Sequence, residues 1–283
     1  MRPTTAITLL LTLACRCASA QFYYKDVLST QETGAKQQVY KTNHVRKVTV
    51  RNYNPDGSEN KDFVCEQTLN PSFTSVATLT GSSATGQSLL TSYFDDSTRL
   101  IRSVDSSATS ATITVYTYTS TGSLLSIRSD SHTTNDTVHY NNKTVEVHTW
   151  QYGPSGQPAA MLSIKNGSDT TWVTLKTDDQ GNVTDELSYH QGGVLQHYYY
   201  YYDDTRHLTD IVRFNTQLQR MVPDYMFEYS PSGSLDQMTI VQVLDNNYLI
   251  WRYEYDDNGL RVKELCYDRS KELVGSIGYE YAR

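Results

Sequence analysis

The chain has 283 residues and a formal net charge of −7, and 38% of its residues are hydrophobic. Nucleic-acid binding needs clustered lysine and arginine side chains, and this acidic sequence has no such cluster, so a nucleic-acid partner is not expected. The modest apolar fraction favours a layer with a small core over a thick globule.

The first twenty residues have the pattern of a secretory signal peptide. Arg2 supplies a positive start, residues 6–14 form a short and mostly apolar run, and residues 18–20 are Ala-Ser-Ala, a small-x-small cleavage site. A segment of this kind directs export and is removed from the mature protein. We therefore expect residues 1–20 to be cleaved and the mature chain to begin at Gln21.

Export sets the expected location of the protein. Without Arg2 and Arg16 the net charge changes from −7 to −9, and no later stretch has the roughly 20 apolar residues that a membrane-spanning helix needs. We expect a secreted or periplasmic protein with no transmembrane segment in the mature chain. The alternative is lipid attachment through Cys15, because residues 12–15 partly resemble a bacterial lipobox, with the aliphatic residue one position too close to the cysteine.

Two cysteines remain after the signal peptide, too few for a scaffold built on disulfides. Cys65 and Cys266 each lie in an apolar strand pattern. They either form one bridge that closes a very long loop or remain two buried thiols. The sequence leaves both states open.

A short helix is predicted ahead of the first strand. Ser29 and Glu32 have the spacing of a capping box, and residues 30–43 are polar with several good helix formers. A helix in this place would cover the first edge of the sheet and shield its unpaired backbone groups.

Most of the remaining chain consists of copies of one unit, an aromatic–polar–aromatic triplet followed by a turn with glycine. The clearest copies are residues 253–259 (Tyr-Glu-Tyr-Asp-Asp-Asn-Gly) and 227–233 (Phe-Glu-Tyr-Ser-Pro-Ser-Gly). The last aromatic residue of each copy, or the residue in its place, lies at positions 53, 94, 118, 152, 177, 202, 229, 255 and 281. A repeat with a period of about 25 residues indicates an array of one supersecondary unit.

Residue types within the unit predict two strands joined by a tight turn. Aromatic residues recur at every second position with polar residues between them, as in residues 251–255 (Trp-Arg-Tyr-Glu-Tyr). This period of two is typical of strands with one buried face. The glycine that ends each copy, such as Gly259, supplies the left-handed residue of a type I turn with a bulge. Gly192 lies outside this register and is expected to tolerate substitution better.

Two steps of the array are longer than the others. One contains residues 72–86, which are rich in Ser, Thr and Gly, and the other contains the polar stretch 130–144. Both are predicted to be longer hairpin loops within a single β-repeat domain, residues 21–283.

Five consecutive tyrosines, residues 198–202, form the most unusual stretch. Tyr199 and Tyr201 occupy positions that are polar in most other copies, so both faces of this strand are aromatic. Two interpretations remain. Either the sheet covers both faces here, or Tyr199 and Tyr201 are ligand-binding residues of an exposed platform for sugar rings or an apolar ligand.

Candidate metal ligands are found in one segment. His197, Asp203, Asp204 and His207 have suitable side chains, but both aspartates fall on a repeat turn, where Asp serves turn hydrogen bonds. The turn at residues 256–259 lacks the ligand spacing of a calcium loop. We therefore expect no metal site.

Catalytic motifs, phosphate loops and dinucleotide-binding fingerprints are missing from the sequence. Asp185 and Glu186 are adjacent carboxylates, but neighbouring strand residues point to opposite faces, so they are interpreted as solvated charges. We expect a protein that is not an enzyme and that carries no cofactor.

The repeat resembles the YD repeat of bacterial RHS-type proteins, most clearly at residues 253–260, Tyr-Glu-Tyr-Asp-Asp-Asn-Gly-Leu. The resemblance extends over residues 48–283, and in that family hairpin repeats join into a continuous antiparallel sheet that winds around itself. The chain departs from the family in its longer period and at Thr98, Thr177 and Arg206. It holds no RHS core motif, so the toxin-delivery role is not expected here. The resemblance implies the sheet, a bacterial extracytoplasmic setting and a binding role, as for small secreted repeat proteins with no known activity.

These patterns together predict an all-β fold. We expect an antiparallel meander of about nine hairpin-like repeats that forms one long, twisted, curved single sheet, with a short N-terminal helix. The expected function is that of an exported, non-enzymatic protein of the cell envelope with a structural or binding role. The alternative is a carrier that binds a glycan, a lipid or another apolar ligand on an aromatic-lined concave face. Whether the sheet closes is left open.

Overall fold

The computed structural model describes residues 22–135, 140–215, 218–242 and 247–283. These residues form one helix, α1 (Lys25–Thr42), and eighteen strands. The strands are β1 (Lys47–Tyr53), β2 (Val64–Leu69), β3 (Ser75–Ser82), β4 (Gly86–Phe94), β5 (Leu100–Ser107), β6 (Ser110–Tyr118), β7 (Leu124–Asn135), β8 (Tyr140–Tyr152), β9 (Pro158–Lys165), β10 (Asp169–Thr177), β11 (Val183–His190), β12 (Gly193–Tyr202), β13 (Leu208–Asn215), β14 (Arg220–Tyr229), β15 (Leu235–Gln242), β16 (Asn247–Tyr255), β17 (Arg261–Tyr267) and β18 (Leu273–Ala282).

The strands form a closed antiparallel barrel. Each strand pairs with the next one along the chain, and β1 pairs with both β2 and β18. The closing register runs from Lys47 opposite Ala282 to Tyr53 opposite Ser276. The prediction of one long, twisted, curved single sheet is therefore wrong, because the sheet is a closed barrel of eighteen strands; the sequence had left closure undecided. The accumulated twist of so many strands brings the two edges together, and closure pairs the backbone groups that an open sheet leaves exposed.

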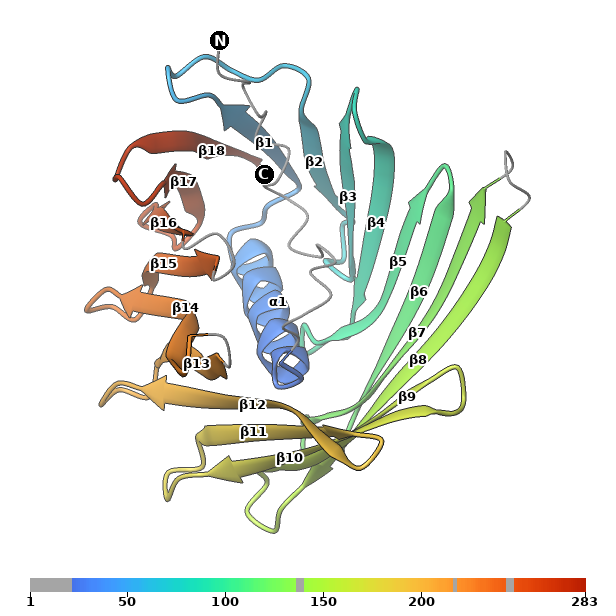
Figure 1. Ribbon diagram of the computed structural model, residues 1–283. Coiled ribbons are helices and arrows are strands. Elements are labelled where there is room, and N and C mark those ends of the chain that lie inside the picture. Colours follow the sequence, from blue (N-terminus) through green and yellow to red (C-terminus); the bar gives the residue numbers. More distant parts are fainter. Residues whose placement is uncertain (1–21, 136–139, 216–217, 243–246) are drawn as a thin grey trace.

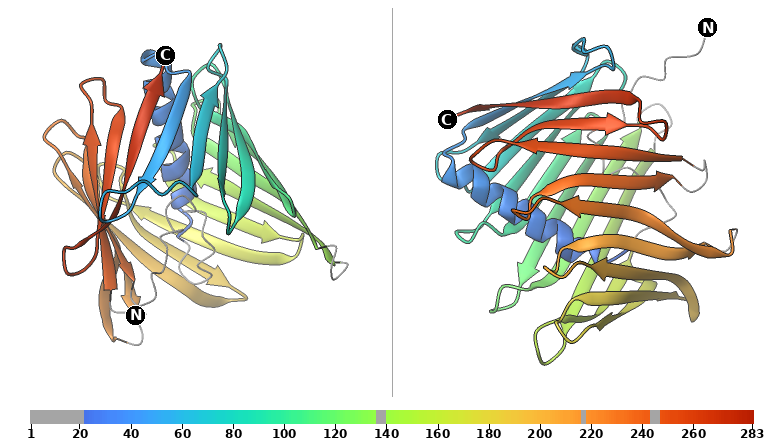
Figure 2. Two further views of the ribbon diagram at one scale, coloured as in Figure 1. Left: turned by 90° about the horizontal axis from the view of Figure 1, so that it is seen from above. Right: turned by 90° about the vertical axis from the view of Figure 1, so that its left-hand side faces the viewer.

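Helix α1 lies inside the ring of strands and not at a sheet edge (Figure 1; Figure 2). It begins at Lys25, one turn before the predicted capping box, so Ser29 is an interior helix residue. The hydroxyl of Ser29 donates to the carbonyl of Asp26 at 3.3 Å, a bond typical of serine within a helix. The capping-box prediction is therefore wrong, because Ser29 lies inside the helix and not at its N-cap. The N-terminal end of α1 is held instead by Glu186 of the barrel wall.

The repeat turns have the geometry predicted from the sequence. Gly233 and Gly259 have φ angles of +85° and +74°, and the N–H of Gly259 donates to the carbonyl of Asp256 at 3.0 Å. The strand register shifts by one residue beside the turn, between Glu254 and Tyr255. The predicted turn with a bulge is confirmed.

Residues other than glycine also adopt the left-handed conformation of this turn. Thr98 and Arg206, which depart from the repeat pattern, have φ angles of +60° and +68°. Gly192 has φ of +82°, because it forms the tight turn between β11 and β12. The prediction that Gly192 tolerates substitution better is therefore not supported.

Tyrosine hydroxyls link successive repeats. The hydroxyls of Tyr118, Tyr152, Tyr229, Tyr255 and Tyr281 donate to the backbone carbonyls of Leu100, Leu124, Leu208, Leu235 and Arg261, at 2.7, 2.7, 3.0, 3.1 and 2.6 Å respectively. Each acceptor is the first residue of the returning strand in the preceding repeat. The link explains why this position favours tyrosine over phenylalanine.

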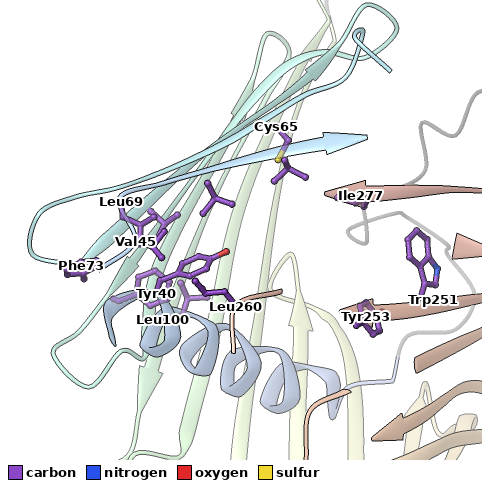
Figure 3. Packing of buried hydrophobic residues seen from close by; sticks show 14 of the residues in the cluster. Tyr40, Val45, Cys65, Leu69, Phe73, Leu100, Trp251, Tyr253, Leu260 and Ile277 are labelled. Carbon is purple, nitrogen blue, oxygen red and sulfur yellow. The ribbon is translucent and has the colours of Figure 1, made fainter. Parts of the chain in front are cut away.

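The inward face of the barrel carries the predicted aromatic residues. Tyr198 and Tyr200 are buried, and so are Trp251 and Tyr253. One buried cluster surrounds the C-terminal half of α1 and includes Tyr40 and residues from both closing edges (Figure 3). A second cluster surrounds Phe22 and the N-terminal half of the helix. The one-sided strand pattern is confirmed, with the barrel interior as the buried side.

The two polar stretches predicted to be loops contain strands. Residues 75–82 form β3, and residues 130–135 and 140–144 extend β7 and β8. Residues 136–139 lie outside the described part of the chain. The strands were not predicted because many of their inward positions, such as Thr78, Thr80 and Ser131, carry Ser or Thr and lack the apolar side chains that reveal a period of two.

Cys65 and Cys266 are both buried and free. They lie on β2 and β17, with β1 and β18 between them in the barrel wall. The sequence left open either a disulfide or two buried thiols, and the structure has two buried thiols. In the described part of the chain, no helix has the length and apolar character required to cross a membrane.

Candidate functional site

A cavity lies between helix α1 and the rim formed by the repeat turns; we call it the rim cavity. Its volume is about 840 Å³. One wall is the helix face that carries Tyr24, Val27, Gln31, Gly34 and Gln38. The opposite wall consists of four turns of the barrel, at residues 97–99, 121–124, 155–158 and 178–181. The volume is within the range of small-molecule sites in proteins.

The lining of the rim cavity combines many neutral polar groups with three charged side chains, Arg99, Asp178 and Asp179. Amides and hydroxyls come from the helix and from the turns, namely Thr30, Gln31, Gln38, Ser97, Thr121, Ser123, Ser155, Gln157 and Gln180. Tyr118 and Tyr152 add aromatic rings, whose hydroxyls are already used by the links between repeats. The buried Gln157 Oε1 has no hydrogen-bond partner among the described residues. Such a lining can hydrogen-bond a neutral polar molecule and pack against its apolar faces.

Glu186 of β11 holds the N-terminal end of α1. Its Oε1 accepts the Tyr23 N–H at 2.7 Å, and its Oε2 accepts the Tyr24 N–H at 2.7 Å and the Tyr200 hydroxyl at 2.8 Å. A carboxylate in this place satisfies backbone donors and interacts favourably with the positive end of the helix dipole. Glu186 is 1% exposed, and burial raises its pKa from 4.5 to about 7 against the opposing effect of these hydrogen bonds.

A second polar contact joins the first turn of α1 to β8. His148 Nδ1 lies 2.6 Å from Asp26 Oδ2, and His148 Nε2 lies 3.1 Å from Glu146 Oε1. Burial alone would lower the pKa of His148, but the hydrogen bonds to the two carboxylates outweigh it and raise the pKa from 6.5 to about 9. His148 is therefore a cation between two anions at neutral pH. We call Glu186, His148, Asp26 and Glu146 the polar seat of the helix.

Further contacts fix the helix along its length. The Gln37 side-chain amide donates to the Phe73 carbonyl at 2.7 Å, and the Tyr40 hydroxyl donates to Gln67 at 3.1 Å. A Cβ at Gly34 would lie 3.0 Å from the Thr98 carbonyl oxygen, so the missing side chain lets the helix approach the wall. These contacts make α1 one wall of the rim cavity.

A smaller cavity of about 260 Å³ lies beside the polar seat. Asp26 and Ser29 of the helix face Thr114 and Ser129 of the barrel across it. The helix therefore stands clear of β6 and β7 at this level.

The sequence-predicted residues Tyr199 and Tyr201 lie on the outer face of the barrel, away from both cavities. Tyr201 is 51% exposed. Tyr199 is partly buried, its ring stacks on His197 at 4.0 Å between centroids, and its hydroxyl lies 3.0 Å from His197 Nδ1. The structure thus separates these two residues from the inward Tyr198 and Tyr200, and ligand binding by them stays a prediction.

The other candidates of the sequence serve local structure. Asp203 accepts the N–H groups of Thr205 and His207 at 2.9 and 2.8 Å, as expected for a turn aspartate. His197 contacts Asp185 at 3.1 Å instead of joining that turn. In the described ranges, no group of three or more His, Cys, Asp or Glu residues could hold a metal ion.

The residues of the polar seat were missed by sequence reasoning. Glu186 was interpreted as a solvated charge, which is wrong because it is among the most buried side chains of the barrel. Its period-two position was the available signal, since it lies on the inward face two residues from Ser188, which is also buried. His148 had the same signal, because it alternates with Trp150 on β8.

No family model and no curated protein matches the chain. Among solved structures, the chain is similar to a chain in the crystal structure of TcdB2-TccC3-Cdc42, at 12% identity and a TM-score of 0.31, over 81% of this chain and 18% of that chain. It is also similar to a porin-like protein from Bacteroides uniformis ATCC 8492, at 10% identity and a TM-score of 0.39, over 84% of this chain and 98% of that one.

A porin-like protein from Bacteroides vulgatus ATCC 8482 gives 13% identity and a TM-score of 0.27, over 84% of this chain and 98% of that one. At such low identities and scores the similarities carry no argument about function. The resemblance of the repeat to the YD repeat stays a prediction from the sequence.

Proposed function

We propose that the chain is an exported, non-enzymatic binding protein of the cell envelope that holds a hydroxyl-rich ligand, of the oligosaccharide class, in the rim cavity. The observation that carries this proposal is the lining of a cavity of about 840 Å³ by many amides and hydroxyls together with tyrosine rings, beside the charged side chains of Arg99, Asp178 and Asp179. Amide and hydroxyl groups can both donate to and accept from sugar hydroxyls, and aromatic rings pack on the apolar faces of sugar rings.

The interior of the barrel argues against the alternative function, in which an apolar ligand binds on the inward aromatic face. Tyr198 and Tyr200 are covered by the chain itself, since Phe22 and Tyr24 contact them at ring-centroid distances of 5.4 to 5.8 Å. An apolar ligand on this face would have to displace the N-terminal end of α1. The polar rim cavity requires no such displacement.

A glycan array with the mature protein tests the proposal. We expect retention of at least one oligosaccharide and affinity at least about tenfold weaker in a Gln31→Leu, Gln157→Leu double variant, a loss of about 1.4 kcal/mol. The matched control is Gln87→Leu, an exposed glutamine on β4 that should leave affinity unchanged. Absence of glycan binding, or equal affinity in the double variant, would refute the proposal.

The export part of the proposal has its own test. N-terminal mass analysis of the protein from its native host should find Gln21 as the first residue, as the small-x-small site at residues 18–20 predicts. An acylated Cys15 at the N-terminus would instead show a lipid-anchored protein.

A further inference from the structure

We propose that helix α1 takes up protons when it docks in the barrel, at Glu186 and His148, so that the barrel holds its helix more firmly as the pH falls. The two groups come from different strands, β11 and β8, and both contact the first residues of the helical segment. The coupling rests on the seat of the helix and not on any ligand.

The geometry makes the protonation of both groups depend on the helix. Glu186 is 1% exposed and His148 is 7% exposed while Phe22, Tyr23 and Tyr24 cover this part of the wall. When this segment leaves the wall, Glu186 becomes hydrated and His148 loses Asp26 as a partner. Both groups then return toward their ordinary pKa values of 4.5 and 6.5.

The sign of the coupling is the same for the two groups. Both pKa values are raised in the docked state, to about 7 for Glu186 and about 9 for His148. The contribution of Glu186 to docking is complete below pH 4.5 and is lost as the pH rises through about 7. The contribution of His148 is complete below pH 6.5 and is lost as the pH rises through about 9.

Charged and titratable neighbours from every packed element enter this balance. Around His148 they are Asp26 of α1, the Tyr23 ring, Glu146 of β8 and, beyond Glu146, Lys165 of β9. Around Glu186 they are Asp26, Tyr23 and the two tyrosines Tyr198 and Tyr200 of β12. Asp26 lies near both groups, so it favours the protonated form of each one and couples the two sites.

The consequence for binding rests on the proposed function. Tyr24 and Val27 line the rim cavity, and they belong to the segment that the polar seat holds. Loosening of this segment removes one wall of the cavity. A ligand in the rim cavity would therefore be held more firmly at low pH than at high pH.

Hydrogen exchange of the full mature protein tests the coupling without a ligand. Protection factors, corrected for the intrinsic pH dependence of exchange, give the opening equilibrium of the first turns of α1. Between about pH 5 and about pH 9 we expect this equilibrium to rise at least about tenfold, since one unit of pKa shift is a tenfold change. Amides that pair β1 with β18 should change less and are the internal reference.

Variants separate the two groups. His148→Gln keeps a donor for Asp26 but cannot titrate, so the rise above about pH 6.5 should disappear while the lower part remains. Glu186→Gln should remove the lower part. Glu254→Gln, an exposed change on the outer face, should keep the full profile. If Glu186→Gln fails to fold, the wild-type and His148→Gln profiles still show whether the opening of α1 depends on pH and whether His148 accounts for the upper part of the profile.

The outcomes distinguish this inference from the proposed function. A helix whose opening equilibrium is the same from about pH 5 to about pH 9 would overturn the coupling, even if the protein binds a glycan. A pH-dependent helix in a protein that binds no glycan would support the coupling and refute the proposed function.

Discussion

Two regions of the barrel wall face the same lumen with different chemistry. The aromatic wall is the inner face of β12–β18. The hydroxyl wall is the group of Ser and Thr side chains on the inner face of β3–β7, a face that also carries Val76, Phe94, Tyr116 and Ile127. The aromatic wall includes Tyr198, Tyr200, Tyr225, Phe227, Trp251, Tyr253 and Tyr279. The hydroxyl wall includes Thr78, Thr80, Ser88, Ser103, Thr112, Thr114, Ser129 and Ser131.

The helix treats the two regions differently. Phe22, Tyr24 and Tyr40 pack against rings of the aromatic wall, whereas a cavity of about 260 Å³ separates Asp26 and Ser29 from the hydroxyl wall. Across the hydroxyl wall, side chains instead pair with each other between neighbouring strands. One hairpin repeat can therefore build either a packed core or a polar surface, because the turn and the strand pairing do not depend on the inner side chains.

The largest expected effect tests the aromatic wall. Tyr200→Ala should destabilise the protein by about 3–5 kcal/mol, because it removes a buried ring and the hydroxyl that binds Glu186. The matched control is its neighbour Tyr201, which is 51% exposed on the outer face, where Tyr201→Ala should stay within about 0.5 kcal/mol. Urea unfolding measures both. Equal losses at the two tyrosines would contradict a one-sided wall.

A smaller effect is expected at a turn shared by all repeats. Gly259 has φ of +74°, so Gly259→Val should destabilise the protein by about 1–2 kcal/mol through backbone strain. Gly193 is a suitable control, because its φ is not in the left-handed region and an added Cβ would meet its nearest neighbour at 3.8 Å. Thermal unfolding should therefore show a lower Tm for Gly259→Val and little change for Gly193→Ala. A wild-type Tm for Gly259→Val would show that the turn geometry is wrong.

The two features on which these predictions rest, the repeat turns and the inward aromatic faces, could be predicted from the sequence because their signals are local. The turns follow from glycine positions, and the inward faces follow from a period of two in aromatic residues. Closure was not predictable in this way, since the pairing of Lys47 with Ala282 joins residues from opposite ends of the array and no side-chain pattern marks it. The inward positions of Glu186 and His148 could have been predicted from the period of two, but their contacts with the helix could not, because Glu186 and Tyr23 are 163 residues apart. Two parts of the hydroxyl wall, residues 75–82 and 130–135, were predicted to be loops because Ser and Thr carry no apolar periodicity.

The links between repeats should matter equally in both regions. The Tyr118 hydroxyl donates to Leu100 at 2.7 Å beside the hydroxyl wall, and the Tyr229 hydroxyl donates to Leu208 at 3.0 Å in the aromatic wall. Tyr118→Phe and Tyr229→Phe should each destabilise the protein by about 1 kcal/mol, the net value of one hydrogen bond. Tyr201→Phe is the control and should have no measurable effect. If only one of the two changes lowers stability in urea, the link does not serve both regions alike.

The smallest expected effect tests the hydroxyl wall. Thr112 and Ser131 lie opposite each other on β6 and β7, and their hydroxyl oxygens are 3.0 Å apart. Thr112→Val keeps the shape of the side chain and removes one hydroxyl, and Ser131 remains partly exposed and able to bond water. Lost hydrogen bonds are expensive when they leave a buried group unsatisfied, and they change stability little when water replaces the partner. We therefore expect a change within about 0.5 kcal/mol in urea unfolding, smaller than that of Tyr118→Phe. A loss as large as that of Tyr118→Phe would mean that the hydroxyl wall is part of the packed core, and the contrast between the two regions would fail.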